Sequence, residues 1–303
     1  METVAVLMST YNGESYLREQ VESILSQKDV DVELVIRDDG STDGTIDIIN
    51  ELSRDYSNIH FITGQNMGYA NSFLTLLKYD IEADYYAFAD QDDVWEESKL
   101  ANAINKIRLR PYSVYASALQ IVDENLKPIS YKKYSNYRAT VGSVLSRIRL
   151  AGCTMVFGDD LKKKIEYLLD DIIEFNKFNY GHDAWIMLLA LLNSGDIVVD
   201  GNSYIKYRRH AQTITNINGG LKKRIKNELR IFWNKNNTRV KIANFLLKYG
   251  TLFDPAVLVV IEDISFYQKN IAIRTKLIFG DEIITNLKSV DFKNKLAVLL
   301  GRY

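Results

Sequence analysis

Three aspartates lie within four residues of one another, directly after an apolar, aromatic run. The run is Tyr85–Ala89, and the aspartates that follow it are Asp90, Asp92 and Asp93. Carboxylates at this density raise each other's pKa unless a positive group lies among them. A hard divalent cation, Mn²⁺ or Mg²⁺, prefers such oxygen ligands and often completes its coordination shell with water and substrate phosphates. The cluster therefore predicts a metal site for a phosphate compound; the alternative is a solvated acidic turn without a ligand.

Asp93 and Trp95 refine this prediction. Side chains alternate between the two faces of a strand, so Asp93 would point to the opposite face if the strand continued. Trp95 adds a flat apolar face of the kind that sugar rings pack against.

The turn at residues 38–44 holds a second candidate site residue. It superficially resembles a calcium-binding loop, but Asn50 stands at the twelfth position, where such a loop needs a bidentate Glu. For most of the turn we expect a simple connection whose polar side chains cap the next helix. Asp39 is the exception, because a carboxylate at the strand end could accept the imide N–H of a uracil or thymine ring.

The elements that position these residues alternate between strand and helix patterns. Strands are expected at residues 4–8, 33–37, 59–62 and 85–89, with helices near 16–27, 46–52 and 69–79. This alternation predicts an α/β fold with a parallel sheet and helices on both faces. Ligands bind at the carboxyl ends of such strands, so the loops that follow the four strands are expected to face one crevice.

The second half of the chain has a different pattern. A strand is expected at 114–121, a long tyrosine-rich loop at 131–137, helices at 161–169 and 184–192, and short strands at 197–199 and 204–207. Beyond residue 220 only helical patterns remain.

Composition excludes several classes of protein. The 303 residues are 47% hydrophobic and 25% charged, as in soluble globular proteins, and the net charge of -1 argues against a nucleic-acid binder. The single cysteine, Cys153, excludes an internal disulfide and a cysteine-rich zinc site, and a reducing, cytoplasmic setting fits it best. The N-terminus lacks the pattern of a signal peptide. The longest apolar stretches fall short of the roughly 20 residues that a membrane-spanning helix needs.

Residues 221–250 form a strongly basic segment, with nine Lys and Arg against one Glu. Leu221, Ile225, Leu229 and Phe232 would share one face of a helix. A basic amphipathic helix of this kind predicts binding to the anionic inner face of the cell membrane. The alternatives are a dimerisation helix and an ordinary solvated face.

Other nucleotide and hydrolase signatures are absent. The chain has no G-x-x-x-x-G-K-[ST] loop and no G-x-G-x-x-G after the first strand, which argues against P-loop and NAD-binding enzymes. The first strand is followed by Ser9–Asn12, which shows no nucleophile elbow.

Together these segments resemble the family 2 glycosyltransferases, a large inverting group with the GT-A fold. The resemblance covers roughly residues 3–215 and rests on four motifs in the family's order. They are Met8–Asn12, similar to the opening strand and nucleotide loop; Asp38–Asp43, similar to the base-binding turn; Asn66–Asn71, similar to the next loop; and Asp90–Asp92, in the place of the D-x-D motif. The resemblance implies a Rossmann-like mixed sheet in a domain at 1–215, with a nucleotide-binding half (1–110) and an acceptor half (111–215). A helical C-terminal region would follow at 216–303.

The resemblance also implies roles for individual residues. Contacts with the nucleotide of a nucleotide-sugar donor are implied for Ser9, Tyr11, Asp39, Gly68, Asn71 and Asp90, with Tyr11 stacking on the base and Asp90 touching the ribose. The metal ion, Mn²⁺ or Mg²⁺, would be held by Asp92 and His210. Contacts with the acceptor or with phosphates are implied for Trp95, Gly152, Trp185 and Arg208.

Asp183 is the implied catalytic base. In the family this base usually belongs to a Glu-Asp pair that opens a helix, and here His182 takes the place of the Glu. An inverting transfer needs a general base near the acceptor hydroxyl, and the metal would stabilise the leaving diphosphate as a Lewis acid. One carboxylate is therefore enough for the transfer, because the metal assists the leaving group in place of an acid.

Two segments, Asp90–Trp95 and Gly152–Phe157, are most similar to bacterial rhamnosyltransferases of surface polysaccharide synthesis. They imply transfer of L-rhamnose from dTDP-rhamnose to a hydroxyl of a glycan on a lipid carrier. Donors that carry UDP, with galactose, glucose or an N-acetylhexosamine, remain alternatives because few contacts select the sugar. A sugar nucleotidyltransferase and a non-catalytic carbohydrate-binding module are the alternatives from other classes. The first usually has a basic, glycine-rich loop where this chain has Ser9–Glu14, and the second would not need Asp183.

Overall fold

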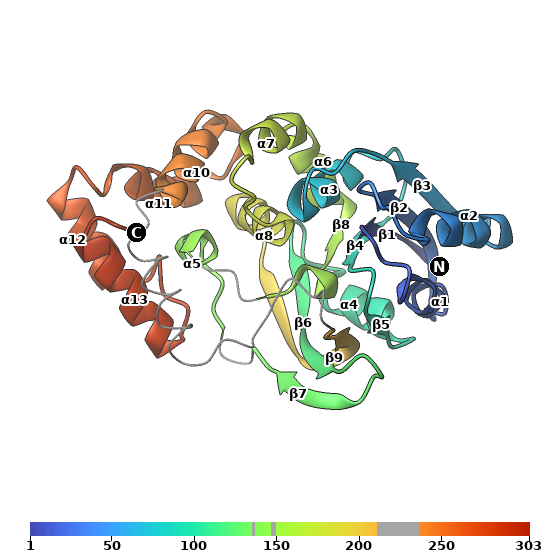
Figure 1. Cartoon of the computed structure of the whole chain (residues 1–303). Helices are drawn as coiled ribbons and strands as arrows, with labels where there is room; N and C mark the ends of the chain where they lie inside the picture. The colour runs from blue at the N-terminus through green and yellow to red at the C-terminus, as the bar shows by residue number, and fades with distance from the viewer. Residues whose placement is uncertain (135–136, 147–149, 211–236) are drawn as a thin grey trace. The chain divides into compact units, whose positions relative to one another are not determined.

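The computed structural model describes residues 1–134, 137–146, 150–210 and 237–303 (Figure 1). The chain forms two compact units. The first comprises Met1–Ser135, Arg149–Ala190 and Gly195–Arg209, and the second comprises Asn136–Ile148, Leu191–Ser194 and His210–Tyr303. The predicted boundary between residues 215 and 216 lies outside the described residues and stays a prediction.

A mixed β-sheet forms the centre of the first unit. Its strands are β1 (Glu2–Thr10), β2 (Val30–Asp38), β3 (Ile59–Thr63), β4 (Tyr85–Ala89), β5 (Val94–Trp95), β6 (Val114–Val122), β7 (Pro128–Lys132), β8 (Val156–Gly158) and β9 (Ile197–Arg208). They follow the order β3-β2-β1-β4-β8-β6-β9-β5, and β7 pairs with β6 beside this path. β1 pairs in parallel with β2 and β4, and β2 with β3. The carboxyl ends of these four strands therefore meet at one edge of the sheet, as predicted.

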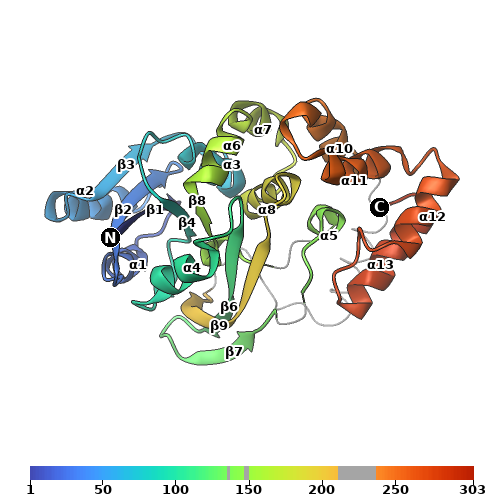
Figure 2. The same ribbon diagram turned by 180° about the vertical axis from the view of Figure 1, so that it is seen from behind.

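Helices cover both faces of this sheet (Figures 1 and 2). The helices α1 (Leu17–Leu25), α2 (Thr45–Asp55) and α4 (Lys99–Ile107) pack on the face that carries Val4, Val6 and Met8. The helices α3 (Tyr69–Leu76), α6 (Asp159–Glu166) and α8 (His182–Leu192) contact Tyr86 and Phe88 on the other face. A strand covered on both faces is apolar along its whole length, which explains the continuous run at residues 4–8.

Two elements of the first unit differ from the expectation. β9 is one long strand rather than two short ones, because its pairing with β6 continues through residues 200–203 with a shift of register. The helix expected at 161–169 ends at Glu166, and α7 (Leu169–Phe175) follows as a separate helix. The expected α/β fold with a mixed sheet is otherwise confirmed.

The second unit is helical. It contains α5 (Val141–Ser146), α10 (Thr238–Leu247), α11 (Pro255–Phe266), α12 (Ile271–Phe279) and α13 (Lys288–Leu299). Asp254 and Asn270 cap α11 and α12 by accepting hydrogen bonds from backbone N–H groups of the first turn. The hydroxyl of Tyr303 donates to the carbonyl of Gly142, which ties the C-terminus to α5.

The helical character expected after residue 220 is confirmed from residue 238 onward. The predicted basic helix with Leu221, Ile225, Leu229 and Phe232 lies outside the described residues. None of the helices in the described ranges combines the length and the apolar character that crossing a membrane requires.

Candidate active site

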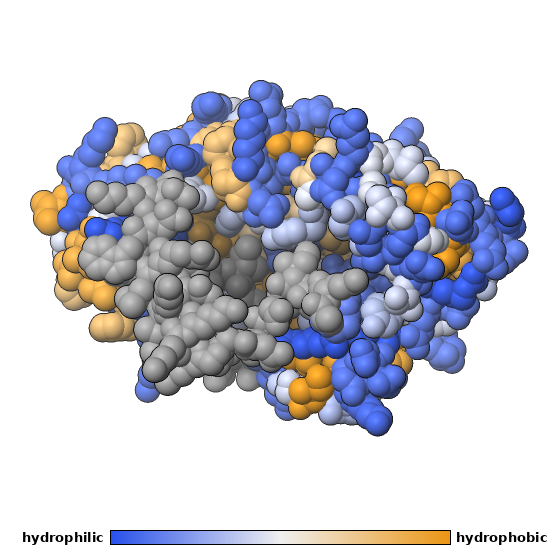
Figure 3. Space-filling view, viewed as in Figure 1, coloured by the Kyte–Doolittle hydropathy of each residue, from blue (hydrophilic) through white to orange (hydrophobic). Residues whose placement is uncertain are grey.

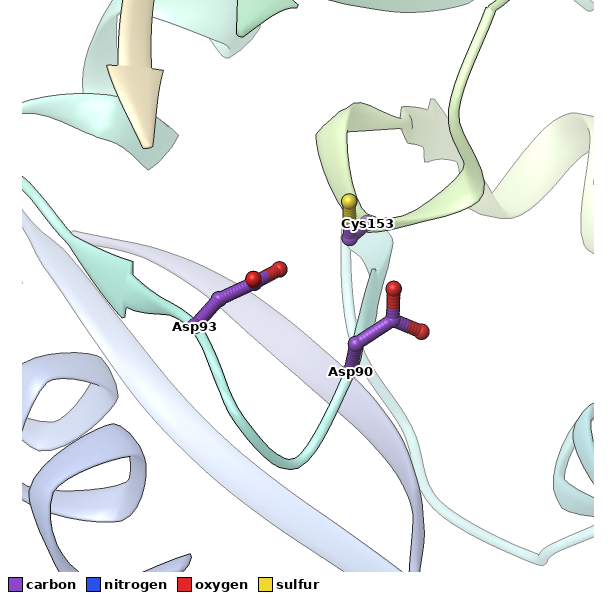
Figure 4. A group of neighbouring side chains, drawn as sticks. All are labelled: Asp90, Asp93 and Cys153. Carbon is purple, nitrogen blue, oxygen red and sulfur yellow. The ribbon is translucent and has the colours of Figure 1, made fainter. Parts of the chain in front are cut away.

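The acidic turn connects β4 to β5 at the edge of the sheet where the parallel strands end. In Figure 4, Asp90 and Asp93 lie on the two arms of the turn, and their carboxyl groups point to the same side, toward Cys153. Ligand atoms of these three side chains lie within 4.8 Å of one another. The expectation that Asp93 points to the opposite face is therefore wrong. The chain turns at residues 91 and 92 instead of continuing as a strand, which brings Asp93 back toward Asp90.

Electrostatic repulsion in this turn is strong. Burial, and after it the neighbouring Asp92, raise the pKa of Asp90 to about 7. Burial also raises the pKa of Asp93 well above its ordinary value, with added effects of Asp92 and Asp90. The Oδ2 atom of Asp93 is buried and has no hydrogen-bond donor among the described residues. Buried carboxylates that raise one another's pKa, with one carboxylate oxygen lacking a donor in the described part of the chain, fit a divalent cation.

Hydrogen bonds hold the turn to the loop after β1. Gln91 pairs with the backbone of Tyr11: its Oε1 accepts from the Tyr11 N–H at 2.8 Å, and its Nε2 donates to the Tyr11 carbonyl at 3.0 Å. The side chain of Gln20 donates to the carbonyl of Asp90 at 2.9 Å. Sequence reasoning missed both glutamines, although the position of Gln91 between two aspartates was a visible signal. The Tyr11 ring is about half exposed, so it is available for stacking.

Arg208 fixes the other side of the turn. Its backbone N–H donates to Asp93 Oδ1 at 3.1 Å, and its side chain donates to the carbonyls of Asp92 at 2.8 Å and Glu124 at 2.6 Å. The guanidinium also pairs with Glu19 and is buried. Each guanidinium nitrogen of Arg208 donates to a protein acceptor, so Arg208 positions the metal candidates. Its predicted contact with the phosphates stays a prediction.

Arg208→Met is expected to lower the free energy of unfolding by about 2–4 kcal/mol, because the variant leaves buried carbonyls without their donor. Denaturant titration of both proteins measures the difference. Arg110→Met is the matched control, since Arg110 makes an exposed ion pair with Asp196 and should contribute less than about 1 kcal/mol. Equal losses in the two variants would contradict the positioning role of Arg208.

Asp39 organises the loops at the ends of β2 and β3. Its buried carboxylate pairs with Arg37 and accepts hydrogen bonds from the backbone N–H groups of Met67 at 3.0 Å and Gly68 at 3.1 Å. Arg37 also donates to Ser72 Oγ at 2.8 Å. The structure thus gives Asp39 a role in holding the loops that follow β2 and β3, and its contact with the base stays a prediction. Arg37 was missed, although a cation next to two aspartates at a strand end is a recognisable signal.

Three further residues with predicted nucleotide contacts lie close to the hydrogen bonds of Asp39 and Arg37. Gly68 precedes α3 with φ of 80°, a conformation that favours glycine. The hydroxyl groups of Ser9 and Ser72 are hydrogen-bonded at 2.6 Å. Asn71 Oδ1 accepts from Asn176 at 3.0 Å. The three positions surround the same edge of the sheet, as expected, and no nucleotide contact is tested for them.

Asp183 lies in the first turn of α8. Its Oδ1 accepts a hydrogen bond from the Ala184 N–H at 2.8 Å. Burial raises the pKa of Asp183 to about 6. Asp183 also raises the pKa of Asp90, and both carboxylates, after burial, raise the pKa of Tyr69. The candidate base, the acidic turn and Tyr69 therefore face one region, and Tyr69 is a site residue that sequence reasoning did not name.

His182 has a different environment from the Glu whose place it takes. Its ring stacks on Phe73 at 4.0 Å and meets Phe88 edge-on at 4.7 Å, measured between centroids. Burial lowers the pKa of His182 to about 3, so the ring is neutral. A Cβ atom at Gly152 would lie 2.5 Å from His182 Nε2. Close packing against His182 explains the glycine at this buried position, and the predicted contact of Gly152 with a ligand stays a prediction.

The two tryptophans assigned to the acceptor are core residues. Trp185 is fully buried, and Trp95 is 3% exposed with Lys99 Nζ at 3.4 Å from its ring centroid. Neither ring has a face for a sugar, so both predictions are wrong for this structure. His210 directly follows β9 and belongs to the second unit. Its predicted contact with the metal stays a prediction.

The fold and the site define a nucleotide-sugar transferase, and the comparisons with known proteins identify its family. Residues 5–161 match the family described as Glycosyl transferase family 2. The chain belongs to this family of glycosyltransferases. The match favours this enzyme class over the nucleotidyltransferase and the carbohydrate-binding module.

Relatives from bacteria extend the similarity beyond these residues. Over 265 residues the chain is 31% identical to the dTDP-rhamnosyl transferase RfbG of Shigella flexneri. The match covers 79% of this chain and 84% of that protein. The chain is 37% identical over 105 residues to the UDP-Glc:alpha-D-GlcNAc-diphosphoundecaprenol beta-1,3-glucosyltransferase WfaP of Escherichia coli, covering 35% of this chain and 41% of that protein.

A solved structure supports the fold. The crystal structure of S. aureus TarS 1-349 in complex with UDP matches with a TM-score of 0.52 at 16% identity, covering 100% of this chain and 93% of that one. The predicted GT-A fold with helices at the C-terminus is thereby confirmed.

Proposed function

We propose that this glycosyltransferase is metal-dependent and inverting, and that it moves L-rhamnose from dTDP-rhamnose to a hydroxyl of a growing, lipid-linked surface polysaccharide. The observation that carries the donor is the similarity to RfbG over most of both chains. Enzymes of one family change donor through a few contacts, so glucose from a UDP-sugar, as named for WfaP, is the second candidate.

The site residues divide the proposed reaction between them. Asp183 accepts the proton of the acceptor hydroxyl as that oxygen attacks the anomeric carbon, and the bond to the nucleoside diphosphate breaks on the opposite face of the sugar. The loops held by Asp39 bind the base, the Tyr11 ring stacks on it, and Asp90 contacts the ribose. Asp92 would hold Mn²⁺ or Mg²⁺. The bound ion would supply Lewis-acid stabilisation of the leaving diphosphate.

Thermal-shift measurements test the donor. A ligand that binds the native state raises the Tm, so dTDP-rhamnose with Mn²⁺ is expected to give a larger rise than UDP-glucose or UDP-N-acetylglucosamine at equal concentration. ADP-glucose serves as the control nucleotide sugar, because adenine has no ring N–H on the edge that would donate to Asp39. A larger rise with a UDP-sugar would overturn the rhamnosyl proposal and leave the glycosyltransferase assignment intact.

We also propose that the second unit binds the anionic inner surface of the cell membrane, which places the enzyme in the cytoplasm beside a lipid-linked acceptor. Residues 210–303 carry 16 Lys and Arg against 7 Asp and Glu, whereas residues 1–209 carry 22 against 32. Phe279 of α12 and Phe292 of α13 are 81% and 68% exposed. Figure 3 shows apolar side chains along the edge where Figure 1 places α12. Basic charge beside exposed aromatic rings supports interfacial binding, and a homodimer surface is the alternative.

Liposome flotation tests the membrane proposal. The protein is expected to float with vesicles that contain phosphatidylglycerol and to stay behind with pure phosphatidylcholine. Phe279→Ser together with Phe292→Ser should reduce flotation several-fold, because each change removes apolar area that enters the bilayer. Leu109→Ser, at an exposed position of the first unit, is the control and should float as the parent does. Failure of the parent to float with either vesicle would sink the idea, and light scattering would then test the dimer.

A further inference from the structure

Tyr69, the first residue of α3, is an aromatic side chain with surface left for a ligand. It is 41% exposed, whereas Trp95 and Trp185 are buried. Its ring meets the ring of His182 edge-on, with 6.3 Å between the centroids and 79° between the planes. His182 opens α8 and directly precedes Asp183. Tyr69 therefore lies beside the start of α8, which carries the candidate general base.

Neighbours of Tyr69 on α3 hold the helix against this part of the chain. Asn71 Oδ1 accepts a hydrogen bond at 3.0 Å from Nδ2 of Asn176, in the segment that precedes α8. One turn further along α3, the Phe73 ring stacks on His182 with 4.0 Å between the centroids and 27° between the planes. Asn176 and Phe73 are buried. The position of Tyr69 relative to α8 is thus set by packing within the protein and needs no substrate.

The residues before Tyr69 belong to the loop that Asp39 holds at the end of β2. The N–H groups of Met67 and Gly68 donate to the Asp39 carboxylate at 3.0 Å and 3.1 Å. Gly68 is directly followed by Tyr69. Tyr69 therefore connects the loops proposed to bind the nucleobase with the start of α8.

A nucleotide sugar would have to bridge the same two parts. In an inverting transfer the anomeric carbon lies between the leaving diphosphate and the acceptor oxygen, whose proton the general base accepts. The transferred sugar therefore lies between the nucleotide and Asp183, in the region that Tyr69 borders. Aromatic side chains in such sites supply apolar surface against which the C–H groups of a sugar can pack. Burial first, and then Asp183 and Asp90, raise the pKa of Tyr69, which agrees with this placement.

We propose that Tyr69 binds the transferred sugar: its ring packs against that sugar and contributes to the affinity for the nucleotide sugar, but not to the affinity for the nucleotide alone. The inference rests on the proposed transfer with Asp183 as the general base. It adds a residue that selects the sugar part of the donor, in a place for which the buried Trp95 and Trp185 have no free surface. A tyrosine that only shaped the loop would affect the nucleotide and the nucleotide sugar alike.

Tyr69→Ala tests this role by isothermal titration with two ligands that differ only in the presence of the sugar. The Kd for dTDP-rhamnose is expected to rise about five- to twentyfold, and the Kd for dTDP by less than about twofold. Tyr69→Phe keeps the ring and should stay within about twofold of the parent for both ligands. If Tyr69→Ala does not fold, Tyr69→Leu takes its place, because Leu fills the position without an aromatic face and should show the same difference between the two ligands.

Tyr56→Ala is the matched control. Tyr56 is 39% exposed, close to the value for Tyr69. It follows α2 and precedes β3, so it lies at the edge of the sheet opposite to the candidate site. Its loss should change neither Kd.

The outcomes separate this inference from the proposed function. If the parent binds UDP-glucose more tightly than dTDP-rhamnose, the rhamnosyl proposal fails, and the comparison of UDP-glucose with UDP then decides the role of Tyr69. If the parent binds neither nucleotide sugar, the proposed function and the inference fail together.

Three results would overturn the inference alone. Equal losses for nucleotide and nucleotide sugar in Tyr69→Ala would mean that the side chain serves the nucleotide or the loop. Unchanged values of Kd for both ligands would mean that the ring makes no contact with the donor. A loss in Tyr69→Phe as large as that in Tyr69→Ala would mean that the hydroxyl group, and not the ring, makes the contact.

Discussion

Asp183→Asn is expected to lower kcat by about 10²–10⁴-fold, the range that a general base contributes. Asn keeps the size of the side chain and an oxygen that can accept from the Ala184 N–H, so the start of α8 should be preserved. The carboxylate is the only feature lost. Binding of the donor should therefore be unchanged, because the proposed contacts of the nucleotide come from residues at the ends of β1, β2, β3 and β4 and not from α8.

Single-turnover assays with saturating donor measure the loss, and calorimetry with the donor checks binding. Asp170→Asn is the matched control, since Asp170 also lies in the first turn of a helix and its exposed side chain pairs with Lys78. The control should retain full turnover. Unchanged turnover in Asp183→Asn would refute the assignment of the base, whereas lost donor binding would point to a structural role.

The pH dependence of the same step gives an independent check. A base works in its deprotonated form, and burial raises the pKa of Asp183 to about 6. The rate is therefore expected to rise with pH up to about 6, to fall about tenfold per unit at lower pH, and to level off above. In Asp183→Asn the residual rate should no longer fall as the pH drops below about 6. A fall that persists in the variant would mean that another group titrates.

Asp92→Asn is expected to cause the second large loss, about 10²–10⁴-fold in kcat at low Mn²⁺ concentration, because a neutral amide is a weaker ligand for a hard cation than a carboxylate. Removal of divalent cations from the parent with EDTA should give a loss of similar size that Mn²⁺ reverses. In the variant, a higher Mn²⁺ concentration should be needed for half-maximal activity.

A direct measurement of metal affinity separates this role from folding. Titration calorimetry of Mn²⁺ in the presence of dTDP should show at least a tenfold weaker Kd for Asp92→Asn, with the Tm in EDTA unchanged or raised, since one charge of a repelling cluster is removed. Glu97→Gln is the control, because Glu97 is an exposed carboxylate paired with Lys28. Full activity of the parent in EDTA would contradict metal dependence altogether.

Local patterns predicted the four parallel strands, the helices between them and the loops that carry the site. They could do so because a strand buried on both faces must be apolar throughout, and because polar residues at its end must then belong to the connecting loop. The apolar runs of β1 and β4 and the positions of Asp39, Asp90 and Asp183 could therefore be read from the chain alone.

The direction of side chains within the acidic turn required the tertiary structure. Asp93 points toward Asp90 because residues 91 and 92 turn the chain. Side chains alternate between the two faces of a strand, so leaving the strand there changes the side on which the Asp93 carboxylate lies. Arg208 is more than 100 residues away in sequence, yet it donates to Asp92 and Asp93, because β9 lies against β5 in the sheet. No local pattern contains such a pairing.

Burial also distinguishes side chains that could contact a ligand from side chains of the same type that belong to the core. Trp95 and Trp185 have the chemistry of a sugar platform, but the packing of neighbouring helices covers both rings. Likewise, residues 136–148 belong with the C-terminal helices, a grouping that their own composition does not reveal. The chemical groups of the site and their order along the chain could be predicted without the structure, because these follow from residue type and local periodicity. The tertiary structure decided which of them face one another, since that depends on strand pairing and packing between distant segments.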